Sequence, residues 1–145
     1  MEFPDLLELI RICKQHAILT ALDNTWGAGI AFKPFKLSTQ AELAVDFSIH
    51  ALTKYPSGGG DVLMGSVTTR RDDVARKLKL SHMRLGFGVG ANDVELVLRS
   101  LPSIALRYRA HDEATRALAV WCQTQSAFVQ VLHPALPNSP GHAFW

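Results

Sequence analysis

Three short apolar runs in the first half of the sequence constrain the fold more than any other feature. The run from Ala17 to Leu22 is bounded by polar residues and is too short for an ordinary helix, so it predicts a buried strand. Residues 44–52 alternate between apolar and polar side chains, and residues 62–69 give a third strand candidate. Helical patterns precede and follow these runs. The sequence therefore predicts an α/β fold with a mostly parallel sheet and flanking helices.

The helices are expected at both ends of this strand region. Apolar residues recur at helical spacing from Leu6 to Cys13, with Asp5 placed to cap the first turn, and this helix is expected to end near His16. Further helices are expected at residues 72–80, 92–100 and 103–123, and a last short strand at 128–132. Three prolines make the segment 133–145 irregular.

Composition indicates one soluble globular domain. The chain has 145 residues, enough for one ordinary domain, and 48% of them are hydrophobic. A net charge of +2 is too small to indicate a nucleic-acid binder, and the basic residues between 70 and 84 alternate with acidic ones as on a solvated helix face. No apolar run approaches the roughly 18 residues that a membrane span needs. The first residues show no signal-peptide pattern, so a cytoplasmic protein with reduced cysteines is expected.

Two polar residues with reactive side chains follow predicted strands. Asp23 comes directly after the first strand, and Lys54 follows the second, with Thr53 before it. In parallel α/β sheets ligands bind beyond the carboxyl ends of strands, so this acid and this amine could face one pocket. Such a pair suits pyridoxal 5'-phosphate (PLP), whose aldehyde reacts with a lysine and whose pyridine nitrogen needs a carboxylate partner. Thr53 and the glycines at 58–60 could bind its phosphate.

Each of these residues also has an ordinary interpretation. Lysines are mostly exposed surface residues, and an aspartate before an Asn-Thr pair commonly belongs to a turn. Consecutive glycines commonly form a flexible turn. The six histidines lie in no metal-ligand motif, and no metal site is predicted. The G-x-G-x-x-A pattern at residues 86–91 follows a basic, helix-like segment, so it predicts a loop between helices and no nucleotide site.

Four segments, in order along the chain, resemble the cysteine/methionine metabolism family of PLP-dependent enzymes. Residues 23–26 (Asp-Asn-Thr-Trp) resemble the segment that contacts the cofactor nitrogen, and residues 46–61 resemble the cofactor-lysine signature. Residues 98–109 resemble the interdomain helix, and residues 133–145 the passage into the C-terminal domain. The first and last of these segments are most similar to the family's cystathionine β-lyases. Ala51, Leu52, Pro56 and Gly59 depart from the commonest signature.

The resemblance implies a role for three residues. Lys54 would carry the cofactor through its amine and move the substrate α-proton, Asp23 would pair with the pyridine nitrogen, and Thr53 would contact the phosphate. The implied fold is part of an aspartate aminotransferase-like major domain. The implied reaction is β-elimination of cystathionine or a related thioether to homocysteine, pyruvate and ammonia. A γ-lyase or γ-synthase, or an inactive remnant that keeps only the fold, remains an alternative.

The resemblance also implies that the chain matches only the middle of longer enzymes. Residues 1–132 would be the C-terminal part of the cofactor-binding domain, including the interdomain helix, and residues 133–145 would begin a linker to a further domain. Family members are expected to be homo-oligomers. They also hold the substrate carboxylate with an arginine that lies beyond this segment, so weak or absent activity is expected of these residues alone.

Overall fold

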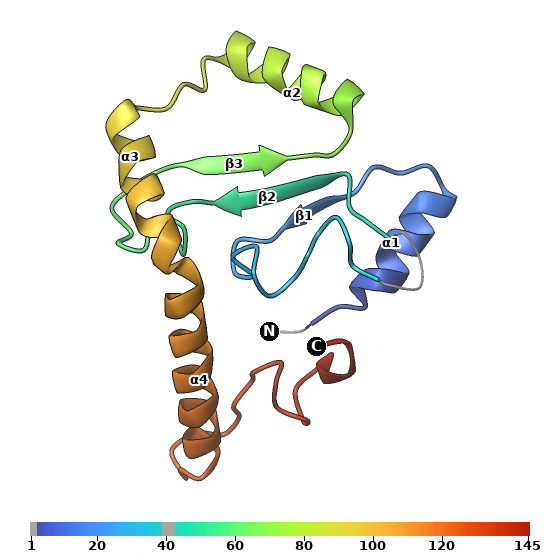
Figure 1. The fold of residues 1–145 in the computed structure, drawn as a ribbon. Helices are drawn as coiled ribbons and strands as arrows, with labels where there is room; N and C mark the ends of the chain where they lie inside the picture. The colour runs from blue at the N-terminus through green and yellow to red at the C-terminus, as the bar shows by residue number, and fades with distance from the viewer. Residues whose placement is uncertain (1–2, 39–42) are drawn as a thin grey trace.

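A computed structural model describes residues 3–38 and 43–145 (Figure 1). Residues 1–2 and 39–42 of the predicted 1–132 unit lie outside this description. One sheet occupies the middle of the described chain, with strands in the order β1-β2-β3. The elements are the helices α1 (Leu6–Gln15), α2 (Asp72–Leu85), α3 (Ala91–Ser100) and α4 (Ile104–Gln123), the short 3₁₀ helices η1 (Leu101–Ser103) and η2 (His142–Phe144), and the strands β1 (Ala21–Asp23), β2 (Phe47–Ala51) and β3 (Gly65–Thr68).

The sheet is mixed, so the prediction of a mostly parallel sheet is wrong. Strands β1 and β2 are parallel, with Asp23 opposite Ile49, whereas β2 and β3 are antiparallel, with Ile49 opposite Val67. Parallel neighbours need a crossover connection of a dozen or more residues, usually a helix. Residues 52–64 contain turns and no helix, so the chain reverses after β2 and returns beside it.

The predicted helices are all present, and the first cap is confirmed. The Asp5 carboxylate accepts a hydrogen bond from the Glu8 amide at 3.0 Å. Helix α2 continues to Leu85, beyond the predicted end, and stops where Gly86 adopts a left-handed conformation with φ +68°. Residues 87–90 then form the predicted loop between α2 and α3.

The predicted strand at residues 128–132 is wrong. This segment is turn and loop, in which the Phe128 amide donates to the Gln125 carbonyl at 3.2 Å, as in a turn. The described sheet consists of β1, β2 and β3, and this segment pairs with none of them. A strand needs a neighbouring strand to hydrogen-bond its backbone N–H and C=O groups. The apolar composition of residues 128–132 does not provide that partner, so it does not determine their structure.

The two faces of the sheet differ in burial. Ser48 in β2 is only 1% exposed, whereas its neighbour Ile49 is 37% exposed. Val67 lies opposite Ile49 on β3 and is also exposed. Because successive strand residues point to opposite faces, the described chain covers the face of Ser48 and leaves the face of Ile49 and Val67 open.

The segment 133–145 folds back onto the start of the chain. The Phe3 amide donates to the Pro140 carbonyl at 3.3 Å, and the rings of Phe3 and Trp145 meet edge to face with centroids 5.2 Å apart. Phe32 contacts both rings. Phe3, the first residue that the structure describes, and Trp145 therefore lie close together, and the segment 133–145 lies below the sheet in Figure 1. No helix in the described ranges is long and apolar enough to cross a bilayer.

Candidate cofactor site

The carboxyl ends of β1 and β2 lie side by side at one edge of the sheet. Asp23 ends β1, and the next amide, that of Asn24, donates to the Ile49 carbonyl of β2 at 2.8 Å. Thr53 and Lys54 follow the end of β2 by two and three residues. The parallel pairing thus brings the segments that carry the predicted acid and the predicted amine to the same edge.

An open concavity of about 410 Å³ lies at this edge. Its volume is in the range of small-molecule and cofactor sites. Asp23 and Thr53 both line it, as two of the three predicted site residues. The other lining residues come from the ends of β2 and β3 and the neighbouring loops, and they are Thr25, Ile49, His50, Ala51, Leu63, Met64 and Gly65.

Lys54, the third predicted residue, is exposed and is not part of this lining. Its Nζ atom lies 5.4 Å from the ring centroid of Trp26, which is a cation–π distance. Lys54 is therefore the residue that follows Thr53 of the lining, and its amine lies against the indole of Trp26. Sequence reasoning placed Trp26 only within the Asp-Asn-Thr-Trp segment and gave it no contact with Lys54.

Asp23 is held as a carboxylate. Its Oδ1 atom accepts hydrogen bonds from the Thr25 hydroxyl at 2.6 Å and the Thr25 amide at 3.0 Å. These bonds, the side-chain bond first, lower the pKa of Asp23, burial opposes them, and His50 adds a smaller lowering. Both bonds end on Oδ1, so Oδ2 keeps its capacity to accept from a cationic N–H group. The ordinary interpretation of Asp23 as a turn residue holds as well, because the amide contact forms an Asx turn.

Thr25 is a site residue that sequence reasoning missed. Its hydroxyl donates to Asp23 and accepts from the Ala51 amide at 2.9 Å, so one oxygen links the ends of two strands. The side chain is 7% exposed. Its position two residues after Asp23 indicates the turn, but the link to Ala51 depends on strand pairing that no local pattern contains.

His50 is a second residue that was missed. It lines the concavity, and its Nε2 atom lies 3.2 Å from the Ser48 hydroxyl. Burial lowers the pKa of His50, while the charge of Asp23 acts in the opposite direction. The alternation of residues 44–52 put His50 on the polar face of its strand, and that was the available signal.

The glycines at 58–60 do not join the concavity. The Gly58 amide, predicted as a phosphate donor, donates to the Lys54 carbonyl at 2.9 Å, and none of the three glycines lines the concavity. The nearest side chains to Gly58 belong to Ser100, the last residue of α3, and Arg107 of α4. This turn therefore packs against a helix instead of offering an anion cradle at the strand ends.

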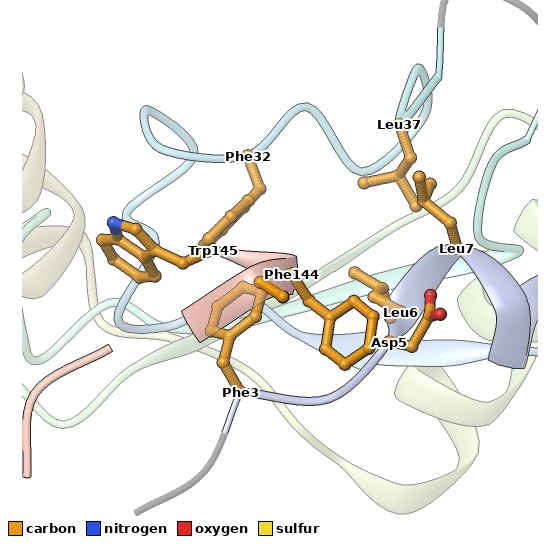
Figure 2. Close-up of a pocket in the computed structure, with 9 residues that line it drawn as sticks. Phe3, Asp5, Leu6, Leu7, Phe32, Leu37, Phe144 and Trp145 are labelled. Atoms are coloured by element: carbon orange, nitrogen blue, oxygen red, sulfur yellow. The ribbon is translucent and has the colours of Figure 1, made fainter. Parts of the chain in front are cut away.

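The donor set at the strand ends fits PLP. Asp23 is an ionised carboxylate suited to a pyridinium nitrogen, Thr53 lines the same concavity and carries a hydroxyl, and Lys54, the next residue, carries an amine. A second concavity, of about 280 Å³, does not fit this cofactor (Figure 2). Phe3, Phe32, Phe144 and Trp145 dominate its lining, and the carboxylate of Asp5 there is used to cap α1.

Comparison with protein families gives a match over the whole chain. The model of the family described as Cys/Met metabolism PLP-dependent enzyme matches residues 1–145. Among curated proteins, the chain is 35% identical over 144 residues to a cystathionine beta-lyase of Bordetella avium. That alignment covers 99% of this chain and 35% of the relative, so the chain spans about a third of the length of the curated relatives it matches.

Solved structures of related enzymes have the same fold over this segment. A cystathionine gamma synthase from Xanthomonas oryzae pv. oryzae, in complex with aminoacrylate and cysteine, matches 99% of the chain with a TM-score of 0.84 and 28% identity. A cystathionine gamma-lyase from Lactobacillus plantarum matches with a TM-score of 0.90 at 22% identity, which supports the fold alone. The chain covers 35% and 36% of these structures.

Proposed function

The chain belongs to the Cys/Met metabolism PLP-dependent enzyme family, and from this premise we propose that it carries the cofactor lysine of a carbon–sulfur lyase. The proposed reaction is β-elimination of cystathionine to homocysteine, pyruvate and ammonia. The observation that supports it most is that Asp23 and Thr53 line one concavity, and Lys54 is the next residue of the chain after Thr53. Residues 1–132 would belong to the cofactor domain, and residues 133–145 would lead toward another.

In the proposed mechanism Asp23 and Thr53 bind the cofactor, and Lys54 both binds it and transfers a proton. PLP, when bound, supplies an electron sink next to the substrate α-carbon. Asp23 would keep a proton on the pyridine nitrogen through its charge, and the Thr53 hydroxyl would donate to the phosphate. The Lys54 amine would hold the cofactor and, once released from it by the substrate, would accept the substrate α-proton, which allows loss of the β-thiolate. Burial lowers the pKa of His50, which lines the same concavity as Asp23.

Cofactor attachment at Lys54 is the first test. The purified chain is mixed with PLP, reduced with borohydride and digested, and the labelled lysine is identified by mass spectrometry. We expect label at Lys54 in preference to the other five lysines, together with a visible absorbance band that Lys54→Ala removes and Lys33→Ala retains. Equal labelling of all six lysines would overturn the proposed cofactor role.

The choice between β- and γ-elimination needs product analysis. The similarity at 35% identity to a cystathionine beta-lyase favours β chemistry, while the match to the gamma synthase structure favours a γ-acting relative. β-Elimination of cystathionine gives pyruvate, whereas γ-elimination by a γ-lyase gives 2-oxobutyrate. We expect pyruvate from a polypeptide that contains this segment in its full family context. Little turnover is expected of the 145 residues alone, because they span about a third of their relatives.

A further inference from the structure

The turn that carries Lys54 is short and internally hydrogen-bonded. The Ser57 amide donates to the Leu52 carbonyl at 2.9 Å, and the Gly58 amide donates to the Lys54 carbonyl at 2.9 Å. The Ser57 hydroxyl adds a bond to the Thr53 carbonyl at 2.8 Å. Because the turn is closed in this way, an anchor on one of its residues restrains the position of the others.

Tyr55 anchors this turn to helix α4. Its ring centroid lies 5.0 Å from that of Tyr108 and 5.5 Å from that of His111. The Tyr55 hydroxyl lies 3.2 Å from His111 Nδ1. Tyr108 and His111 are three residues apart on α4 and so share one face of that helix. Two ring contacts and one hydrogen bond therefore join the residue next to Lys54 to a single helix face.

Gly58 forms a second point of contact with the same helix region. Its φ is +75°, and a Cβ atom added there would lie 2.7 Å from the Ser100 hydroxyl and 2.8 Å from Arg107 Cζ. Arg107 is itself fixed by hydrogen bonds to the Ser100 carbonyl and the Ser103 hydroxyl at 3.2 and 3.0 Å. The backbone of the turn therefore lies close to the end of α3 and the start of α4.

The amine of Lys54 and the ring of Tyr55 meet different partners. Lys54 Nζ lies over Trp26, which follows β1, whereas Tyr55 lies on α4. Trp26, Tyr55, Tyr108 and His111 nonetheless line one small hollow of about 160 Å³. The amine of Lys54 therefore contacts the segment after β1, while the next residue contacts α4.

We propose that Tyr55, Tyr108 and His111 form a clamp that positions Lys54 for attachment of the cofactor. The three are positioning residues, since they act through the turn and not on the reacting atoms. This inference rests on the proposed function, because it assumes that Lys54 is the residue that PLP modifies. It adds that the reactivity of Lys54 depends on its attachment to α4.

The test measures how selectively PLP labels Lys54 in clamp variants. The readouts are the fraction of borohydride-fixed label on Lys54 relative to the other five lysines, and the visible absorbance of the bound cofactor. Tyr55→Leu should reduce the selectivity roughly two- to tenfold, since it removes both ring contacts and the hydrogen bond. Tyr55→Phe keeps the ring contacts and should recover most of the selectivity.

His111→Ala tests the same contact from the α4 side. His111 is exposed, so its removal leaves the fold intact even where Tyr55→Leu perturbs it, and we expect a loss of about two- to threefold. Trp121→Leu is the matched control, an exposed aromatic on α4 away from the turn, and should change nothing. Far-ultraviolet circular dichroism verifies folding of each variant.

The outcomes separate the clamp from the proposed function. If the unmodified sequence labels Lys54 selectively and His111→Ala and Tyr55→Leu do so equally well, the clamp is refuted while the cofactor role stands. If the unmodified sequence shows no preference for Lys54, the proposed function fails, and the clamp fails with it.

Discussion

At the scale of single residues, the Thr25 hydroxyl binds both the charged Asp23 at the end of β1 and the backbone at the end of β2. It donates to the Asp23 carboxylate at 2.6 Å and accepts from the Ala51 amide at 2.9 Å. The first bond helps to keep Asp23 ionised, and the second satisfies a backbone donor at the end of β2. One oxygen atom, that of the Thr25 hydroxyl, therefore bonds both the Asp23 carboxylate and the backbone at the end of β2.

Thr25→Val should separate these effects from packing, because valine keeps the shape and loses the hydroxyl. The Ala51 amide then lacks its partner, and we expect a loss of about 1–2 kcal/mol in the free energy of unfolding at neutral pH, measured with urea. Thr25→Ser, which retains the hydroxyl, should stay within roughly half a kcal/mol of the unmodified chain. Equal stability of the valine and serine variants would contradict the bridging role.

Thr25→Val should also change how the free energy of unfolding falls at acidic pH. Because the pKa of Asp23 is lowered in the folded chain, its contribution is fully present above the unfolded pKa of about 3.9 and disappears as pH falls through the folded value. In Thr25→Val the pKa of Asp23 should rise toward its ordinary value, so the free energy of unfolding should depend less on pH in the acidic range. The contribution is small, because Asp23 is exposed and solvent screens it.

The neighbouring charges predict a coupled titration of His50. Burial lowers the pKa of His50 and the carboxylate of Asp23 raises it, so the net value lies below 6.5. A lowered histidine pKa means that the unfolded chain binds the proton more readily, so stability falls as pH drops below about 6.5. Asp23→Asn should lower the pKa of His50 further, as measured by NMR titration of the imidazole. An unchanged or higher pKa would show that the two groups do not interact.

Sequence reasoning was most successful where one residue determines its own surroundings. Asp5 caps α1 because its carboxylate reaches an amide three residues on, and this needs no other part of the chain. Asp23 was predicted to follow a strand at 17–22, whereas it is the last residue of the shorter strand β1, and the roles of Asp23 and Thr53 toward a cofactor stay predictions. The contacts of Lys54 with Trp26 and of Thr25 with Ala51 join residues far apart in sequence, so no local pattern could reveal them.

At the scale of elements, helices were easier to predict than strand pairing. The amphipathic spacing of α1, α3 and α4 is a local property, and their predicted bounds agree with the structure within a residue or two. The direction of β3 depends on the path of residues 52–64, and the failed strand at 128–132 depended on a partner strand. Both are non-local properties that apolar composition does not determine.

The attachment of the segment 133–145 to the start of the chain gives a prediction at this scale. Gly141 has a φ of +76°, and a Cβ atom there would collide with the Phe3 carbonyl. Gly141→Ala should therefore detach the segment and accelerate hydrogen exchange of the Phe3 amide, which donates to Pro140. Gly86→Ala is the control, since Gly86 has a φ of +68° but open space around it. It should cost only about 1 kcal/mol and leave Phe3 protected.

At the scale of the whole molecule, the chain exposes more surface than a compact monomer of its mass. Its accessible surface is 10290 Å², whereas a compact protein of 16.0 kDa exposes about 7,400 Å². The excess of roughly 2,900 Å² is comparable to the surface that large, permanent interfaces bury. Large apolar side chains contribute to it, and Leu63, Leu106 and Val129 are 94%, 73% and 104% exposed.

We therefore expect the isolated chain to bind a hydrophobic dye and to self-associate at micromolar concentration. Leu63→Ser combined with Leu106→Ser should reduce both the dye fluorescence and the association seen by sedimentation velocity, without lowering stability by more than about 1 kcal/mol. Glu113→Ser, an exposed polar change on α4, should alter neither. A strictly monomeric chain with no dye binding would contradict the expectation.

The ring contact between Phe3 and Trp145 also governs how this segment can be built into any longer polypeptide. Flanking sequence on either side must enter and depart through one patch of the surface, so preceding and following parts of such a protein start out as neighbours. A short peptide joining these two positions should be sterically permissible. New termini could then be opened in the solvent-facing loop at residues 87–90, which would reorder the sequence while retaining the strand ends at which Asp23 and Thr53 meet.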